Sequence, residues 1–272
     1  MPALNRQSPH ALQHSHGGST QLGRLLDLDA RVHASLLDDA LDAVSGHLGH
    51  DPVRRVLDVG AGTGAATFRW SARYPKAEIV ALDANPAMTQ QIAARAGHER
   101  IRTITRPVTA MDLEAGCIDL AWASSVFHEF DDPAAAFAAL AQVIRPGGVL
   151  AVMEMDGPPR VLPDDYDELE TRLRILTRAD ASGPEWTALL EATGFELLEK
   201  RTLVSDQNLP ADGVGGDYAR AELHRLALHA ADGLAAEQEA SLSRILQPGP
   251  DAPALPSVHI RGTRSLWIAR RP

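Results

Sequence analysis

The sequence predicts an α/β protein built on a doubly wound, mostly parallel sheet, and three observations support this. Short apolar segments of strand length alternate with segments of helical periodicity between residues 53 and 155. A glycine-rich turn joins the first apolar segment to the first helix of that region. Aromatic residues make up only 4% of the 272 residues, while alanine and leucine supply much of the apolar content. That composition favours a helix-rich α/β fold over a β-sandwich.

The chain before the first strand divides into two parts. Residues 1–20 contain two prolines, three histidines and a Gly-Gly pair, without the apolar stretch of a secretory signal. We therefore expect a flexible tail there. Residues 21–52 form an expected N-terminal helical segment, because apolar residues recur every four positions up to Leu48. This pattern predicts one helix from Leu25 to about Leu48, ended by Gly49.

The expected elements of the core follow in order along residues 53–155. Pro75 ends the first helix, and Pro86 and Pro133 begin the next two. A Pro-Gly-Gly sequence is expected to separate the last helix from the fifth strand. Because crossover helices connect parallel strands, we expect a parallel sheet with helices on both faces. The predicted strands are 53–59, 77–82, 101–105, 118–123 and 149–155, and the predicted helices are 65–74, 86–96 and 132–144.

The alternation of strands and helices is lost after Asp156. Residues 156–272 are therefore expected to hold the remainder of the sheet, with helical lid insertions at 156–182 and 206–257. We expect these insertions to lie over the edge of the sheet. The helical segments expected here are 164–179, 185–193 and most of 213–246, and the strands are 195–204 and 264–270.

Net charge, hydropathy and cysteine content indicate which classes of partner and which cellular location to expect. The formal net charge is −10, and no basic stripe reverses it locally, so we expect no nucleic-acid partner. No apolar stretch is long enough for a membrane span, so we expect no membrane partner. The single cysteine, Cys117, allows no intramolecular disulfide and fits a cytoplasmic location. The oligomeric state is left open, with a homodimer as the candidate.

The segment 58–64, with the sequence DVGAGTG, is the strongest candidate for a binding site. Glycines let the chain turn sharply and let a ligand touch the backbone, which a Cβ atom would obstruct. The helix that follows offers free N–H groups and the positive end of its dipole. The glycines alone also fit a relaxed dinucleotide-binding pattern.

Two carboxylates narrow the choice of ligand. Asp83 ends the second strand, where a carboxylate can accept hydrogen bonds from ribose hydroxyls. That feature is common to NAD sites and methyl-donor sites. Asp58 precedes the first glycine by two residues, where it suits a cofactor with an ammonium group and would repel a pyrophosphate. The pair favours a methyl donor.

Four segments together resemble the class I S-adenosylmethionine-dependent methyltransferases. They cover roughly residues 53–155 and read VLDVGAGTG at 56–64, ALDANP at 81–86, DLAWASS at 119–125 and RPGG at 145–148. The resemblance implies a Rossmann-like, seven-stranded sheet with an antiparallel last strand. The strands at 195–204 and 264–270 would form its final hairpin. It also implies S-adenosyl-L-methionine as the cofactor and a small molecule as the substrate.

The resemblance implies roles for individual residues as well. The methionine part of the cofactor would lie on the glycines and over Ser124, the ribose on Asp83, and the adenine beside Ala84 and the loop 107–111. Pro107 stands where many relatives carry an acidic residue, so the adenine contact would come from the Val108 backbone. The full implied set of cofactor-binding residues is Asp58, Gly60, Ala61, Gly62, Asp83, Ala84, Val108, Thr109 and Ser124.

Methyl transfer from a sulfonium is an in-line displacement, so the enzyme mainly aligns the reactants and excludes water. A base is needed only when the acceptor is protonated. His128 follows the fourth strand and is our candidate general base. Glu154 ends the fifth strand and is expected to point into the same crevice. No cluster of residues has the spacing of a metal site.

The predicted function is therefore methyl transfer to a small-molecule acceptor at oxygen, nitrogen or carbon. Two alternatives stay open. One is an NAD(P)-dependent oxidoreductase, against which Asp58 speaks. The other is a methyltransferase-like protein that binds the cofactor without transferring its methyl group.

Overall fold

The structure is a computed structural model that describes residues 16–97, 99–177, 185–230, 233–247 and 255–272. It contains a seven-stranded sheet with the strand order β3-β2-β1-β4-β5-β7-β6. Neighbours among the first five strands run parallel, while β7 runs antiparallel to both β5 and β6. The predicted fold class, with its antiparallel last strand, is confirmed. The strands are β1 (Arg55–Val59), β2 (Glu78–Asp83), β3 (Ile101–Thr105), β4 (Ile118–Ser124), β5 (Ile144–Met155), β6 (Glu196–Pro210) and β7 (Ser257–Arg270).

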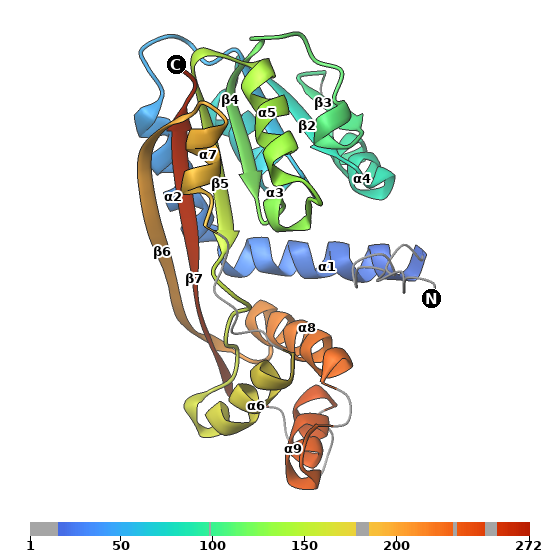
Figure 1. The fold of residues 1–272 in the computed structure, drawn as a ribbon. Helices are drawn as coiled ribbons and strands as arrows, with labels where there is room; N and C mark the ends of the chain where they lie inside the picture. The colour runs from blue at the N-terminus through green and yellow to red at the C-terminus, as the bar shows by residue number, and fades with distance from the viewer. Residues whose placement is uncertain (1–15, 98, 178–184, 231–232, 248–254) are drawn as a thin grey trace, which may run out of the picture.

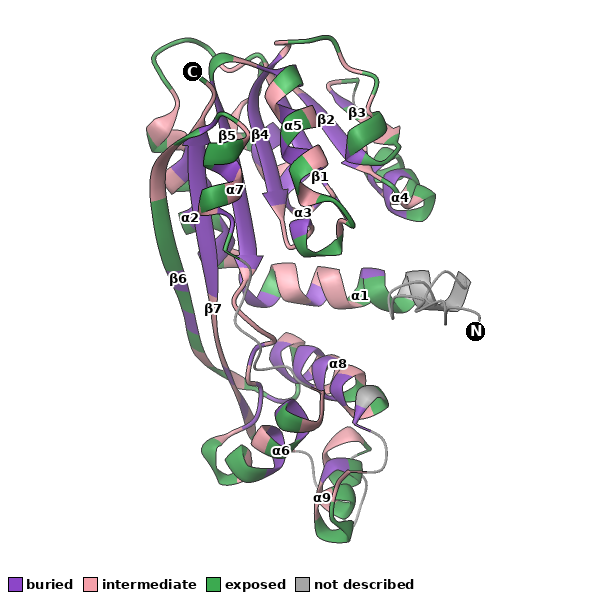
Figure 2. Cartoon of the chain, viewed as in Figure 1, coloured by how far each residue is buried: buried purple, intermediate pink, exposed green. Residues whose placement is uncertain are grey.

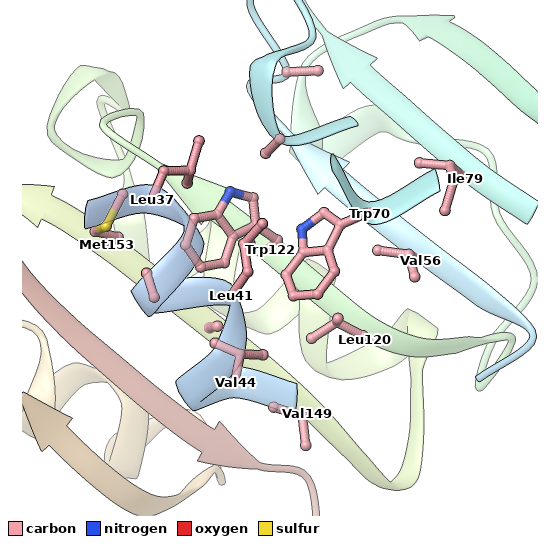
Figure 3. Close-up of a cluster of buried hydrophobic side chains, with 14 of the residues drawn as sticks. Leu37, Leu41, Val44, Val56, Trp70, Ile79, Leu120, Trp122, Val149 and Met153 are labelled. Carbon is pink, nitrogen blue, oxygen red and sulfur yellow. The ribbon is translucent and has the colours of Figure 1, made fainter. Parts of the chain in front are cut away.

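Helices cover both faces of the sheet (Figure 1). One buried cluster joins one face to α2 (Ala34–His47), α3 (Ala65–Arg73) and α4 (Pro86–Ala96). Its centre holds Trp70 and Trp122, whose rings meet edge to face at 5.8 Å (Figure 3). A second cluster joins the opposite face to α5 (Pro133–Val143) and α7 (Thr187–Ala192). The central strands are consequently buried on both sides (Figure 2).

The carboxyl ends of the parallel strands meet at one edge of the sheet. The order of the strands reverses between β1 and β4, which lie side by side although they are not consecutive. Ligands bind at such a switch point in open α/β sheets, because the loops diverge there and leave a crevice. The glycine-rich turn follows β1 at this edge, and the ends of β2 and β4 flank it.

The final hairpin is longer than predicted. The expected strands 195–204 and 264–270 extend to Pro210 and back to Ser257, which pair with each other. The ladder between β5 and β7 ends at Arg264, so residues 257–263 pair with β6 and, at Arg261, form an isolated antiparallel bridge to Arg160. This extension was not predicted, because only a few alternating apolar residues mark it, such as Val258 and Ile260, which are buried against the helices rather than in the sheet core. Figure 2 shows how exposed β6 is along this edge.

A helical cap lies beyond the sheet. It consists of α6 (Asp167–Thr177), α8 (Val214–His229) and α9 (Ala236–Leu246), carried on the extended hairpin. The helix α1 (His16–Val32) runs between the cap and the sheet (Figure 1). A third buried cluster joins residues of α1, α6, α8, α9 and β7. The two predicted insertions therefore supply the cap.

Several sequence predictions need correction. The single helix expected at residues 25–48 is two helices, because the chain breaks and turns at His33, where the buried imidazole packs edge-on against Tyr218. The segment 213–246, expected to be mostly helical, contains the two helices α8 and α9. The segment 164–179 begins with a 3₁₀ turn before α6, and its last two positions lie outside the described residues.

The Pro-Gly-Gly sequence does not separate α5 from the fifth strand. The strand begins directly at Ile144, and residues 145–148 form a bulge within it, since Ile118 pairs with Ile144 while Leu120 pairs with Val149. Gly147 takes a φ of +77°, and its N–H donates to the Arg271 carbonyl. This arrangement ties the bulge to the end of the chain.

The predicted tail lies mostly outside the described residues, although α1 already begins at His16. Within the described part of the chain, no helix is both long enough and apolar enough to cross a bilayer.

Candidate functional site

The glycine-rich turn adopts a backbone that favours glycine. Gly60, Gly62 and Gly64 have φ values of +64°, +53° and +88°, which L side chains rarely adopt. The turn is anchored to β2, because Ala61 N–H donates to the Leu82 carbonyl at 3.0 Å. These backbone angles agree with the sharp turn that the three glycines predict.

Asp83 connects the end of β2 to the same turn. One carboxylate oxygen, Oδ2, accepts from Gly62 N–H at 2.8 Å, and Oδ1 accepts from Asn85 N–H at 2.8 Å. Burial raises the pKa of Asp83, while these two backbone donors oppose the rise. Each carboxylate oxygen keeps a further lone pair, which is what a ribose diol needs.

Two other segments cover the turn closely. A Cβ atom at Gly60 would lie 2.3 Å from Val126 Cγ2, and one at Gly62 would lie 3.3 Å from Leu26 Cδ1. Val126 belongs to the loop after β4 and Leu26 to α1. The structure therefore brings that loop and α1 onto the predicted cofactor-binding turn. No motif in the sequence marks Val126 or Leu26, so sequence reasoning missed them.

Asp58 lies deeper than its predicted role suggests. Its side chain is buried, with an exposure of 2%, and accepts a hydrogen bond from the Thr67 hydroxyl of α3. Burial raises the pKa of Asp58 to about 7, against the Thr67 hydrogen bond, and the nearby Asp83 carboxylate raises it further. Asp58 is therefore poised to lose a proton near neutral pH when a positive charge arrives.

The remaining predicted cofactor residues lie around this centre. Ala84 follows Asp83 and is exposed, as a stacking position for a base requires. Val108 is buried in a 3₁₀ turn (Val108–Ala110) that packs against α5, whereas Thr109 is exposed. Ser124 ends β4 and is half-buried.

Beside Val126, the buried Glu154 side chain forms a hydrogen bond with the more exposed imidazole of His128. Glu154 is 1% exposed and accepts hydrogen bonds from Val126 N–H at 3.0 Å and Phe127 N–H at 2.7 Å. Its other oxygen lies 2.7 Å from His128 Nδ1. The outer nitrogen, Nε2, lies 3.2 Å from Glu129 Oε1. Glu129 and Glu154 together raise the pKa of His128 to about 10, against its burial.

A cavity of about 610 Å³ opens next to this region. It lies between α1, α4 and α8, and Met88 of α4 is one of its lining residues. None of the predicted cofactor residues lines it. Its walls are Gly23, Arg24, Asp27, Leu28, Arg31, Ala87, Met88, Gln91 and Asp217. Over the described ranges, no three His, Cys, Asp or Glu residues come together as a metal site.

Known proteins match the part of the chain that contains the glycine-rich turn. Residues 57–152 match the family described as "Methyltransferase domain". The chain is 30% identical over 152 residues to the trans-aconitate 2-methyltransferase of Deinococcus radiodurans, covering 54% of this chain and 57% of that enzyme. It is 31% identical over 132 residues to a malonyl-[acyl-carrier protein] O-methyltransferase of a Methylovorus species, covering 46% and 41%. The chain thus spans about half the length of these relatives.

The fold also resembles that of solved structures. The YcgJ protein of Bacillus subtilis superposes with a TM-score of 0.53 at 18% identity, covering 86% of this chain and 98% of that one. At this identity, the likeness supports the fold alone. It covers more of this chain than residues 57–152, which match the family.

Proposed function

Residues 57–152 belong to the class I methyltransferase-domain family, and we propose that the whole chain transfers a methyl group from S-adenosylmethionine to a small molecule. The observation that carries this proposal is the position of Asp83. It is the last residue of β2, its carboxylate accepts a hydrogen bond from Gly62 N–H of the glycine-rich turn, and we assign it to the ribose. A single residue thus fixes the turn and presents acceptors to a ribose.

The cofactor would extend from this turn toward the loop after β4. Its ribose would bind Asp83, its adenine would lie on Ala84 beside the 3₁₀ turn at Val108, and its methionine part would follow Gly60 and Ser124. The positive end of α3 suits the methionine carboxylate. When bound, the cofactor supplies an electrophilic methyl group, and the residues of this chain orient it.

His128 is the proposed general base. Glu154 holds Nδ1, so Nε2 points outward from the loop that covers Gly60. A histidine oriented by a buried carboxylate is the arrangement of many catalytic bases. Nε2 becomes a base when the acceptor takes the place of Glu129, which is itself exposed. The two carboxylates and one imidazolium carry a net charge of −1, which favours a neutral or cationic acceptor over an anionic one.

Cofactor binding is tested with S-adenosylhomocysteine by calorimetry. The wild type should bind, and Asp83→Asn should bind roughly 10- to 100-fold more weakly, because it loses the charged acceptor of the ribose hydrogen bonds. Asp51→Asn, at an exposed position away from the site, is the matched control and should bind like the wild type. Equal affinity of all three proteins would exclude the ribose role of Asp83.

The role of His128 is tested by the pH dependence of methyl transfer. An acceptor panel should include hydroxyl and amine compounds alongside trans-aconitate, the substrate named for one relative. With a base that is protonated at neutral pH, kcat/KM should rise up to about tenfold per pH unit until pH 10. His128→Gln should lose roughly 100-fold or more in kcat and abolish this pH dependence, while S-adenosylhomocysteine affinity stays unchanged. A flat profile in the wild type would refute the general-base role.

A further inference from the structure

Helix α1 connects the predicted cofactor-binding turn to the cap. On one side, Leu26 approaches Gly62, and a Cβ atom at Gly23 would lie 3.8 Å from Thr63 Cγ2. On the other side, Leu28 and Val32 pack into the buried cluster of the cap. The position of α1 therefore decides how closely the turn is covered.

Asp29 of α1 forms hydrogen bonds to both the final hairpin and the cap. Arg264 of β7 donates from Nη2 to both carboxylate oxygens of Asp29, at 2.7 and 2.8 Å. The Tyr218 hydroxyl of α8 donates to Asp29 Oδ1 at 3.0 Å. Arg264 is 7% exposed and Tyr218 is fully buried. Asp29 thereby joins α1, the final hairpin and the cap.

The two donors are themselves held in place. Arg264 pairs in the sheet with Met155 of β5 and Leu203 of β6, so its backbone cannot follow a moving helix. Tyr218 packs in the cap cluster on the inner face of α8. A buried charge that loses its partner is strongly destabilised, so the contact favours one position of α1. The Gln207 amide adds a hydrogen bond to the Val32 carbonyl at the end of the helix.

The attachment is uneven along α1. Asp29 and Val32 lie in its last turn, whereas Gly23 and Leu26, which cover the cofactor-binding turn, lie one to two turns earlier. Leu22 and Arg24 on the earlier part are exposed. A helix fixed at one end can lift at the other, and the contact at Asp29 sets how readily it does so.

We propose that Asp29 is a positioning residue that, held by Arg264 and Tyr218, keeps α1 closed over the glycine-rich turn and so retains the bound cofactor. This inference rests on the proposed function, in which that turn binds S-adenosylmethionine. Asp29 acts through α1 and does not touch the reacting atoms. Weakening its contacts should speed the escape of the cofactor more than it slows the chemical step.

The test uses Tyr218→Phe, which removes one hydrogen bond to Asp29 but keeps the buried ring. Dissociation of S-adenosylhomocysteine, measured by surface plasmon resonance, should be about tenfold faster, the size of one hydrogen bond to a charged group. The KM for S-adenosylmethionine should rise while kcat changes little. Hydrogen exchange in the ligand-free protein should accelerate at residues 21–32 and stay unchanged in α3.

Asp38→Asn is the matched control, because it breaks an ion pair between helices, to Arg69, without touching α1. It should leave dissociation and exchange at the wild-type level. Asp29→Asn should exceed the effect of Tyr218→Phe, since it also leaves Arg264 without its counter-charge.

The outcomes separate this inference from the proposed function. A wild type that does not bind S-adenosylhomocysteine refutes the proposed function. A wild type that binds, with Tyr218→Phe unchanged in dissociation and in exchange at 21–32, overturns the role of Asp29. Exchange that accelerates equally throughout core and cap also overturns it, because that is the result of general destabilisation.

Discussion

At the scale of single residues, three buried or half-buried acids lie at the edge of the sheet that carries the glycine-rich turn. Asp58, Asp83 and Glu154 lie at or near the carboxyl ends of β1, β2 and β5, and each accepts a hydrogen bond from a loop or helix at that edge of the sheet. Carboxylates of this kind organise loops, and they also make the site sensitive to charge. Among the residues that the structure describes, Asp58 forms no ion pair, and its pKa is raised mainly by burial.

A pH dependence of cofactor affinity follows for Asp58. A sulfonium or ammonium group stabilises its ionised form, so the pKa of about 7 should fall when the ligand binds. Binding then releases a proton, and affinity for S-adenosylmethionine should rise with pH, by up to tenfold per unit below 7, and level off above. Calorimetry in buffers of different ionisation enthalpy should detect about half a proton released at pH 7.

The matched variant for that measurement is Asp58→Asn. It keeps the shape and the Thr67 contact but cannot ionise, so its affinity should not vary with pH between 5.5 and 8. Proton release by the variant equal to that of the wild type would assign the effect to another group.

The contribution of Asp58 to the free energy of unfolding should fall with rising pH, whereas cofactor affinity should rise. A carboxyl group whose pKa is higher in the folded state than its usual 3.8 binds more protons when folded. Its contribution to the free energy of unfolding therefore falls as pH rises from about 4 to about 7. Asp58→Asn should flatten this part of the stability curve in urea titrations at successive pH values.

At the scale of elements, local signals predicted the core well. The helix 86–96 and the strand 101–105 match α4 and β3 residue for residue, since Pro86 begins the helix and the Asn85 side chain caps it. The sharp turn after β1 was predictable as well, because Gly60, Gly62 and Gly64 have positive φ values that favour glycine. The errors lie where tertiary contacts decide, as at His33 and in the hairpin beyond Val204.

The contacts of α1 show most clearly what the sequence could not reveal. Asp29 and Arg264 lie 235 positions apart, and neither belongs to a motif. Asp29 looks like an ordinary exposed helix residue until the fold brings Arg264 beside it. Long-range pairs of this kind leave no periodic pattern, so only the structure identifies them.

Two glycines give a matched test of helix packing. A Cβ atom at Gly216, in the first turn of α8, would lie 1.9 Å from the Ala211 carbonyl oxygen, whereas one at Gly46 in α2 would meet nothing within 4 Å. Gly216→Ala should lower the free energy of unfolding by about 1–3 kcal/mol, because backbone must shift. Gly46→Ala should raise it by about 0.5–1 kcal/mol through helix propensity. Urea unfolding measures both, and equal effects would contradict the packing at Ala211.

At the scale of the whole molecule, two elements connect the sheet core to the helical cap. The β6–β7 hairpin runs from the sheet into the cap, and α1 lies between them (Figure 1). A ligand that binds between the glycine-rich turn and α1 contacts the junction of these parts. It should therefore stabilise the molecule as a unit.

This coupling turns thermal unfolding into a test between the three candidate functions. S-adenosylhomocysteine at about 100 times its dissociation constant should add about 2.7 kcal/mol and raise the melting temperature by roughly 5–10 °C. NADH should give no shift, because the Asp58 carboxylate before the turn repels a pyrophosphate. A shift with NADH alone would favour the oxidoreductase. A shift with S-adenosylhomocysteine, but no methylation of any acceptor by the same sample, would favour a protein that binds the cofactor without using it.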